Sequence, residues 1–399
     1  MIKINEITDD NFLARYKKKV ISKSLLPKFK KYFNTVDLEH KNKIEALFSE
    51  ESLIELTFCG SSELCQIIDK IYKQVPSLAE FYCPEYFFVN FELNYTKSDI
   101  NELDLRKPEN TDVINELFDE TKNNLLLTLR EFQATQLIKF LFTEEHRVTT
   151  AQKKKKLLDI YKFKKGTFKL SEQMKFPFWV SNFSSIFDYE LMSKEFGYDI
   201  TNFLGIDVCP YCNQEEIPTI AVEGAKTRPS LDHFYPKSKF PFLATTLSNL
   251  VPSGKRCNED YKKANSMIGF ANPYHDAVKT DESLFFFKEV FSKEFELENV
   301  EVSVNTNDNA LHMNMCLFNI SLFYDQTYKS DFIDMHEKKE FLKEVGLIEK
   351  TTDISKVPHK KIKHLVGVDL KKPSIKYRLK KYKVDSLNHI FGSQFKTDD

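Results

Sequence analysis

The sequence has no uninterrupted apolar run that approaches membrane-spanning length, so we expect no transmembrane helix. Its opening residues, Met1 to Glu6, lack the apolar core of a signal peptide, so we expect no secretion signal. It also lacks a strong net charge, with a formal value of −1 over 399 residues. Because no overall field attracts a polyanion, any contact with nucleic acid must come from a local cluster of basic residues.

The chain is also poor in cysteine, with seven residues, an odd number. Four of them, Cys59, Cys65, Cys83 and Cys316, are scattered along the sequence. An odd number of mostly scattered cysteines argues against a disulfide framework. We therefore expect a protein of the reducing cytoplasm.

The residues that are present have the composition of an ordinary soluble protein, 41% hydrophobic and 29% charged, in a chain long enough for two or three domains. Apolar residues recur at helical spacing from Thr111 to Phe142, with an N-cap expected at Thr111 or Asp112. Leu284 to Phe287 and Val300 to Val304 have the pattern of strands. These patterns predict a mainly helical α+β protein.

We divide the chain into three parts. Residues 1–200 form a mostly helical region, residues 201–276 hold the motifs that suggest chemistry, and residues 277–399 form a mixed α/β region. The last part contains a strongly basic segment, Lys350 to Lys383, which could bind a nucleic-acid backbone.

Three blocks between Cys209 and Lys263 suggest chemistry: CPYC, LDHFYPKS and LSNLVPSGKRCNEDYKK. Hydrolysis of a phosphodiester needs a base that takes a proton from water and a cation near the phosphate. His233 suits the first task, and the side-chain oxygens of Asp232 and Asn258 suit a Mg²⁺ ion. Neighbouring side chains of a strand point to opposite faces. Asp232 and His233 can therefore both serve only if the strand bends or if they contact the site from different sides.

The stretch from Cys209 to Lys263 resembles the HNH endonuclease superfamily, whose core is a ββα-metal finger. The resemblance rests on the phrases DHFYPKS, FPFLATTLSNLVPS and CNEDYKK, in this order and spacing, and covers about a seventh of the chain. It implies that His233 activates the water and that Asp232 and Asn258 bind a divalent cation, Mg²⁺ or Mn²⁺. It also implies that Asn249 orients the loop and His233 through hydrogen bonds. The phrases are similar in particular to bacterial HNH proteins of anti-phage defence, including the Septu type, which acts beside an ATPase.

Many proteins of this superfamily carry two cysteine pairs that clamp a structural zinc in a tetrahedral thiolate site. Cys209 and Cys212 match the first pair, whereas the second has Gly254 in place of its first cysteine and keeps only Cys257. Two alternatives stay open. Either the three cysteines hold Zn²⁺ with a fourth ligand from His275 or another group, or packing holds the finger together without a metal.

Basic residues surround these motifs. They are Lys237, Lys239, Lys255, Arg256, Lys262 and Lys263. They could be ordinary surface charge, but their clustering around a cation site favours contact with backbone phosphates, which positions a substrate without reading its sequence.

The leading hypothesis is a metal-dependent HNH endonuclease that cuts DNA, an effector nuclease of bacterial anti-phage defence. The first alternative is a nuclease that cuts RNA, for example tRNA, because such a site acts on the phosphodiester and does not distinguish the sugars. The second is a non-catalytic scaffold that binds nucleic acid through a degenerate finger, which Gly254 favours. We expect the regions outside the resemblance to restrain the nuclease or to dock a partner, for which a co-encoded ATPase is the favoured candidate.

Overall fold

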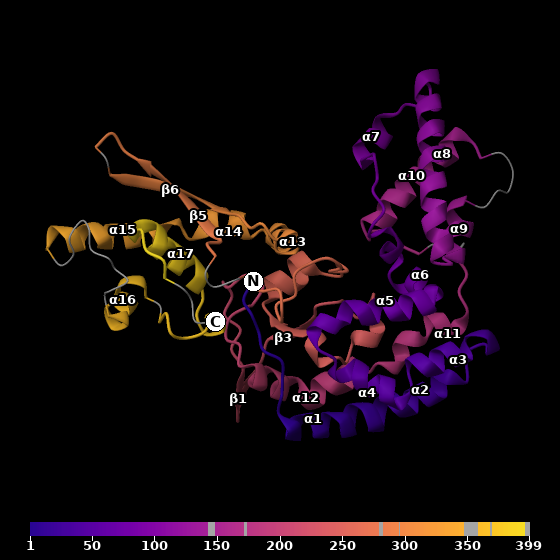
Figure 1. The fold of residues 1–399 in the computed structure, drawn as a ribbon, viewed down its shortest axis with the longest axis horizontal. Helices are drawn as coiled ribbons and strands as arrows, with labels where there is room; N and C mark the ends of the chain where they lie inside the picture. Colours follow the sequence, from indigo (N-terminus) through magenta and orange to yellow (C-terminus); the bar gives the residue numbers. More distant parts are fainter. Residues whose placement is uncertain are drawn as a thin grey trace.

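The computed structural model describes residues 1–142, 148–170, 174–278, 282–294, 296–346, 358–367 and 369–395. Figure 1 shows a central body, an arm of helices that projects from one end of it, and a C-terminal lobe at the other end. Most described residues are helical, and the strands of the described chain form three two-stranded antiparallel sheets. The predicted α+β class is therefore confirmed.

The central body contains a layer of helices from the first part of the chain. α1 (Asp10–Tyr16), the π-helical η1 (Lys17–Leu25) and α2 (Leu26–Phe33) follow one another without a break. The Asp9 side chain starts this stretch because it accepts a hydrogen bond from the backbone N–H of Phe12. The other helices of the body are α3 (Leu38–Leu47), α4 (Glu50–Phe58), α5 (Leu64–Gln74), α6 (Pro76–Tyr82), α11 (Phe178–Ser181) and α12 (Tyr189–Leu204). Short 3-10 turns lie at Ser61–Glu63, Pro84–Phe88, Phe183–Ile186, Pro241–Leu243, Leu247–Asn249 and Ser374–Lys376.

The arm consists of four helices: α7 (Lys97–Glu102), α8 (Pro108–Glu131), α9 (Thr135–Phe142) and α10 (Thr150–Lys164). The helical pattern from Thr111 to Phe142 is confirmed, although a break with Gln133 at φ 55° divides it into α8 and α9. The predicted N-cap is wrong. α8 starts earlier, after Lys107, because Pro108 has a φ suited to a first turn and lacks the N–H that would stay unpaired there.

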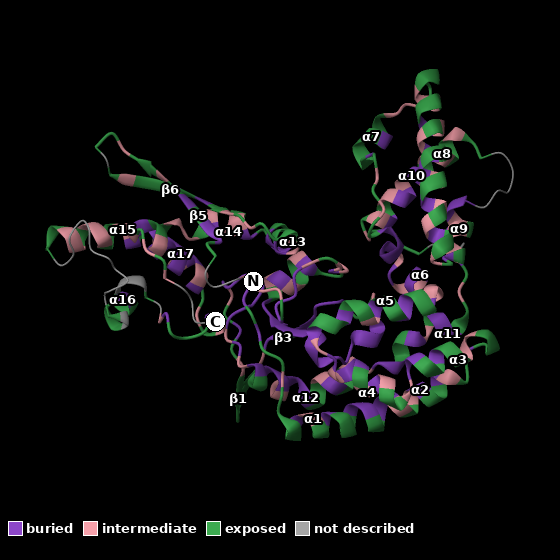
Figure 2. Ribbon diagram, viewed as in Figure 1, coloured by how far each residue is buried: buried purple, intermediate pink, exposed green. Residues whose placement is uncertain are grey.

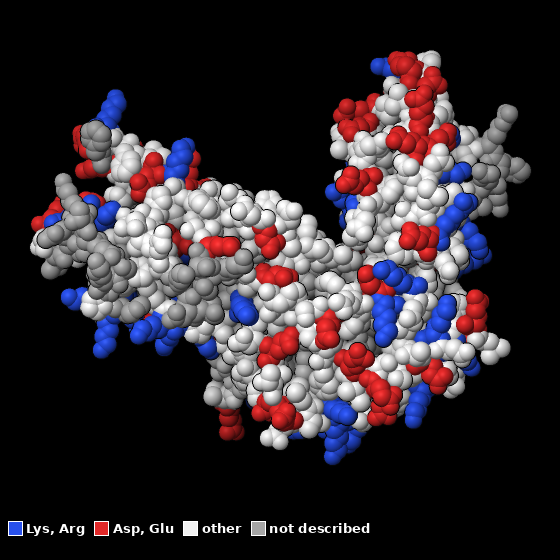
Figure 3. Space-filling view, viewed as in Figure 1, with Lys and Arg blue, Asp and Glu red and all other residues white. Residues whose placement is uncertain are grey.

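The surface of the arm is acidic toward its outer end (Figure 3). Its exposed acidic side chains include Asp99, Glu102, Glu109, Asp112, Glu116, Asp119 and Glu120. This part of the surface would repel a polyanion.

Two strands and a short helix form a compact unit in the centre. β3 (Ser230–His233) pairs antiparallel with β4 (Leu250–Ser253), and Asp232 lies opposite Val251. The π-helical η7 (Arg256–Lys262) follows β4 closely. A small exposed hairpin, β1 (Ile220–Val222) and β2 (Ala225–Thr227), precedes the unit.

The loop between β3 and β4 rests against the layer of helices. The hydroxyl of Tyr16 donates a hydrogen bond to the Thr245 carbonyl at 2.8 Å. The hydroxyls of Thr246 and Ser248 donate to the carbonyls of Leu56 (2.9 Å) and Cys59 (2.7 Å). The helices of the N-terminal part therefore determine where this loop lies.

The C-terminal lobe packs helices on one face of a hairpin. β5 (Phe285–Phe291) pairs with β6 (Leu297–Val304), which confirms both predicted strands. Phe285 and Phe287 are buried, whereas Phe286 between them is 45% exposed, as the alternation of a strand requires. The helices are α13 (Asn309–Leu317), α14 (Ile320–Thr327), α15 (Lys329–Glu344), α16 (His359–Val366) and α17 (Lys380–Phe391). No helix of the described chain is both long and apolar enough to cross a bilayer.

The basic segment Lys350 to Lys383 falls partly outside the described residues, at positions 350–357 and 368. Several of its described lysines are paired with acidic residues: Lys376 with Asp207, Lys381 with Asp385 and Lys383 with Asp331. These ion pairs reduce the positive charge that the segment offers to a nucleic acid.

One continuous apolar core connects the parts, and buried residues run through the central body and into the arm and the lobe (Figure 2). The start of the chain threads through this centre. The backbone N–H of Ile2 bonds the Pro210 carbonyl at 2.8 Å, and that of Ile4 bonds the Pro273 carbonyl at 3.0 Å. The first residues of the chain therefore help to hold the turn that begins at Cys209.

Candidate active site and cysteine cluster

A cleft of about 450 Å³ lies between β3, η7 and α12. Its walls include Tyr189, Arg228, Asp232, His233, Pro236, Lys237, Asn258, Lys262 and Lys263. The structure thus brings the predicted base, His233, and both predicted cation ligands, Asp232 and Asn258, to one cleft. A second cleft of about 410 Å³ adjoins it and shares the residues Tyr189, Lys237 and Ser238.

His233 is buried and oriented by a backbone carbonyl. Its Nε2 lies 2.9 Å from the Ala244 oxygen. A carbonyl only accepts, so Nε2 carries the hydrogen and Nδ1 keeps a lone pair. Burial, together with the charges of Lys237 and Lys262, lowers the pKa of His233 to about 3, although the hydrogen bond to Ala244 opposes this shift. Its ring packs edge-on against Tyr189 at 4.5 Å. The imidazole is therefore neutral at pH 7, in the tautomer that can accept a proton.

Asp232 lies in the wall of the same cleft, with partners of its own. Its Oδ2 accepts a hydrogen bond from the Tyr211 hydroxyl at 2.6 Å, and its Oδ1 accepts one from Lys262 Nζ at 3.0 Å. The same ammonium bonds the His233 carbonyl at 2.7 Å. Burial raises the pKa of Asp232, against the opposing effects of Lys262 and Tyr211. Burial lowers the pKa of Lys262. A carboxylate offers about four lone-pair sites, so two remain for a cation.

Asn249 is fully buried and spans the β3–β4 loop. Its Oδ1 accepts a hydrogen bond from the Tyr235 N–H at 2.8 Å. Its Nδ2 donates to the carbonyls of Tyr235 (3.0 Å) and Leu243 (3.1 Å). Leu243 precedes Ala244, whose carbonyl bonds the His233 ring. The Asn249 side chain therefore fixes the backbone that orients His233.

Asn258 and its neighbours on η7 have different surroundings. Asn258 is half-buried in the cleft, and Lys263 is exposed at its edge. Lys262 is fully buried against Asp232, so its ammonium neutralises the carboxylate inside the protein. Lys237 is exposed on the opposite wall, with its ammonium 4.3 Å from the centre of the Tyr189 ring.

Three other basic residues that the sequence singled out do not line the cleft. Lys255 is exposed beside Glu259. Arg256 stacks on Phe323 at 4.3 Å from the ring centre. Lys239 forms an ion pair with Glu85.

Arg228 is a cleft residue that the sequence analysis missed. Its guanidinium donates to Ser193 Oγ (2.8 Å) and to the Pro229 carbonyl (3.0 Å), over the middle of α12. A Cβ on Gly197 would lie 2.7 Å from this guanidinium, so the glycine leaves the space that the arginine occupies. A glycine inside a helix costs about 1 kcal/mol relative to alanine. That unfavourable residue was the one signal in the sequence of a close approach.

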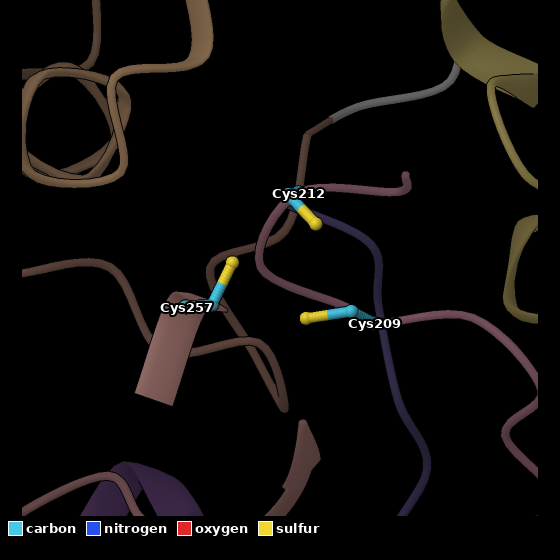
Figure 4. Close-up of side chains that lie close together, drawn as sticks. All are labelled: Cys209, Cys212 and Cys257. Carbon is cyan, nitrogen blue, oxygen red and sulfur yellow. The ribbon is translucent and has the colours of Figure 1, made fainter. Parts of the chain in front are cut away.

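Cys209, Cys212 and Cys257, the last of them on η7, form a buried cluster. Their sulfur atoms lie within 4.8 Å of one another and point toward a common centre (Figure 4). All seven cysteines are free thiols. Hydrogen bonds from the Cys209 and Cys257 thiols hold the pKa of Cys212 well below its usual range. The three thiols could together hold a metal ion, and zinc binding stays a prediction.

His275 is not part of this cluster. Its Nδ1 lies 3.0 Å from Ser61 Oγ, and its Nε2 lies 2.9 Å from Asp276 Oδ2. Both ring nitrogens therefore have other partners, and a fourth ligand has to come from elsewhere.

Comparison of the chain with protein-family models, with curated proteins and with solved structures finds no match. The functional argument therefore depends on the geometry of the two sites.

Proposed function

We propose that the protein is a metal-dependent endonuclease that hydrolyses phosphodiester bonds in DNA. The observation that supports this most is the unit of β3, β4 and η7, which brings Asp232, His233 and Asn258 to one cleft. The order of strand, strand and helix is that of the ββα-metal finger implied by the resemblance. The hydrogen bond to Ala244, which leaves Nδ1 of His233 free to accept a proton, is the second support.

In this mechanism His233 takes a proton from the attacking water at Nδ1. The carbonyl of Ala244 keeps the ring in the required tautomer, and Asn249 holds the loop that presents this carbonyl. Asp232 and Asn258 offer the hard oxygen ligands that Mg²⁺ or Mn²⁺ prefers, so they fit a divalent cation. When bound, the cation would stabilise the charge that develops on the phosphate.

The cationic side chains around the cleft would hold the nucleic-acid backbone. Arg228, Lys237 and Lys263 line it and offer donors to phosphate oxygens. The ammonium of Lys262 is already bound by Asp232, so we assign it to the carboxylate rather than to the substrate. The adjoining second cleft extends the surface past the N-terminal end of α12 toward Ser184 and Ser185, and offers room for the nucleotides beside the cut.

A cleavage assay of His233→Ala against wild type tests this function, with plasmid DNA and total RNA as substrates in Mg²⁺ or Mn²⁺. Loss of a general base lowers the rate by about 10²–10⁴-fold, so we expect at least a hundredfold loss. His312→Ala, which removes an exposed imidazole on α13, is the matched control and should cut like wild type. Cleavage by His233→Ala at the wild-type rate would contradict the mechanism, and cleavage of RNA alone would favour the RNA-directed alternative.

One observation favours the non-catalytic alternative. Both oxygens of Asp232 already accept hydrogen bonds, and Lys262 balances its charge without a metal. If the pair of Asp232 and Lys262 takes the place of the metal, the protein would bind nucleic acid without cutting it. Wild-type protein that retards DNA on a gel but leaves a plasmid intact in Mg²⁺ and in Mn²⁺ would support the scaffold.

We further propose that Cys209, Cys212 and Cys257 bind Zn²⁺, which prefers tetrahedral thiolate sites, and that the protein acts in the cytoplasm. The arm and the C-terminal lobe lie outside the catalytic unit (Figure 1). We propose that they restrain the nuclease or dock a partner, with a co-encoded ATPase of a defence system as the candidate. Purification of the tagged protein from its native operon, without any stoichiometric partner, would count against this role.

A further inference from the structure

Position 254 is the place where the cysteine cluster departs from a set of four thiols. Gly254 lies three residues before Cys257, at the spacing of a second cysteine pair. Its φ is outside the left-handed region, so its backbone does not require glycine. A Cβ at this position would lie 2.0 Å from Glu215 Oε2 and 2.3 Å from Glu215 Cδ. The carboxylate of Glu215 therefore occupies the space in which a cysteine side chain at position 254 would begin.

The two oxygens of this carboxylate differ. Oε1 accepts a hydrogen bond from the Lys255 backbone N–H at 3.0 Å. Oε2 is buried and has no hydrogen-bond partner among the described residues. A buried polar atom without a partner costs about 1–3 kcal/mol, and a bound ion is one recognised way to satisfy such an atom.

Glu215 is tied to the cysteine turn through its backbone. Its carboxylate oxygens do not lie within 4.8 Å of all three sulfur atoms, so its side chain would have to turn toward the cluster to share a metal with them. The Cys209 N–H donates to the Glu215 carbonyl at 2.9 Å, which closes the turn that carries Cys209 and Cys212. Three thiolates leave one position of a tetrahedral zinc site open, and a carboxylate oxygen is an accepted ligand at about 2.0–2.2 Å.

We propose that Glu215 is the fourth ligand of a zinc site whose other ligands are Cys209, Cys212 and Cys257. The proposal rests on the metal-binding role of the cysteine cluster and is independent of nuclease activity. A bound zinc would link the turn of residues 209–215 to the start of η7, which carries Asn258 and Lys262. The metal would thus hold in place the helix that contributes to the cleft.

The simplest rival is that Glu215 only caps the first turn of η7 through Oε1. Glu215→Gln separates the two roles, because the amide oxygen can still accept from Lys255 but is a poor zinc ligand. Glu216→Gln, at the exposed neighbouring residue, is the matched control. The readouts are the zinc content of the purified protein and its zinc affinity in competition with a chelator.

We expect stoichiometric zinc in wild type and in Glu216→Gln. In Glu215→Gln the zinc affinity should fall by at least about tenfold, the lower limit reported for loss of even an outer-shell partner. Wild type without zinc, or Glu215→Gln with the affinity of wild type, would overturn the proposal.

A second variant keeps the test decisive if Glu215→Gln is unstable. Glu215→Ala combined with Gly254→Cys makes space for a fourth thiol and should bind zinc stoichiometrically. Protein produced with Co²⁺ in place of Zn²⁺ reports the ligands by its absorption spectrum. Wild type should show a three-thiolate, one-oxygen site and the double variant a four-thiolate site; identical spectra would refute Glu215 as a ligand. A zinc-loaded protein that cuts nothing would contradict the nuclease and leave this inference standing.

Discussion

The cleft and the cysteine cluster both take residues from the same short helix, η7, but differ in chemistry. Asn258 faces a cleft lined by oxygen and nitrogen donors and open to solvent, whereas its neighbour Cys257 is buried among thiols. Hard oxygen ligands suit an exchangeable Mg²⁺, and soft thiolates suit a tightly held Zn²⁺. The difference teaches that neighbouring residues of one short helix, Cys257 and Asn258, can have unlike surroundings, one a buried thiol cluster and one an open polar cleft.

Removal of the cleft cation should have the largest effect, because it should stop cleavage and leave the cysteine cluster unchanged. Dialysis against metal-free buffer should abolish cleavage, because the cation of the cleft is held by few protein ligands, and added Mg²⁺ should restore the activity. Zinc should remain bound during this treatment, which uses no chelator because chelators remove zinc from thiolate sites. Cleavage assays with zinc analysis of the same samples check this, and activity that persists after the dialysis would remove the distinction.

Cys257→Ser should damage both sites at once. The loss of a ligand should release zinc and lower the free energy of unfolding by at least about 4 kcal/mol, since loss of a metal is among the largest effects of single substitutions. Cleavage should fall as well because η7 carries Asn258. Urea denaturation and zinc analysis measure this, with the exposed Cys316→Ser as control. A variant without zinc that still cuts normally would show that the sites are independent.

Lys262→Met should affect the cleft and spare the cluster. Removing one partner of a buried ion pair costs about 3–5 kcal/mol, because Asp232 then stays buried without its cation. A divalent cation should recover part of this stability by taking the place of the ammonium. Denaturation with and without Mg²⁺ checks both statements, and Lys255→Met at an exposed position is the control. Equal stability of variant and wild type would show that the pair contributes little.

Asn249→Ala should destabilise the loop that presents Ala244. It leaves three buried backbone groups of Tyr235 and Leu243 without their bonds, and we expect a loss of about 3 kcal/mol. Cleavage should fall while zinc stays bound. Asn202→Ala, on the exposed face of α12, is the control. Full activity of Asn249→Ala would contradict an orienting role.

Arg228→Ala should have the smallest effect, confined to binding of the substrate. Loss of one phosphate contact lowers the slope of log affinity against log salt by about 1. DNA binding over a range of salt concentrations measures this, with the exposed Arg130→Ala as control. An unchanged slope would place Arg228 outside the path of the backbone.

The residues of the candidate site could be named from the sequence because their types and spacing are unusual together. Asp232, His233 and Asn258 meet at one cleft as that pattern requires. The proposed fourth ligand of the cysteine cluster could not be named in the same way. His275 was the candidate from the sequence, but the fold gives both of its nitrogens other partners.

Local pattern was enough for β5, β6 and the helical stretch from Thr111 to Phe142, since these depend on neighbours in the chain. The order of strand, strand and helix around the motif was expected only from the resemblance. The contacts of Lys262 with Asp232, of Arg228 with α12 and of Glu215 with Gly254 join residues about 30–40 positions apart. Such contacts are decided by packing. The sequence left open that Lys262 is a surface charge, but the fold buries it against Asp232. Gly254 stands where a ligand cysteine was expected, and the fold places the Glu215 carboxylate in the space beside it.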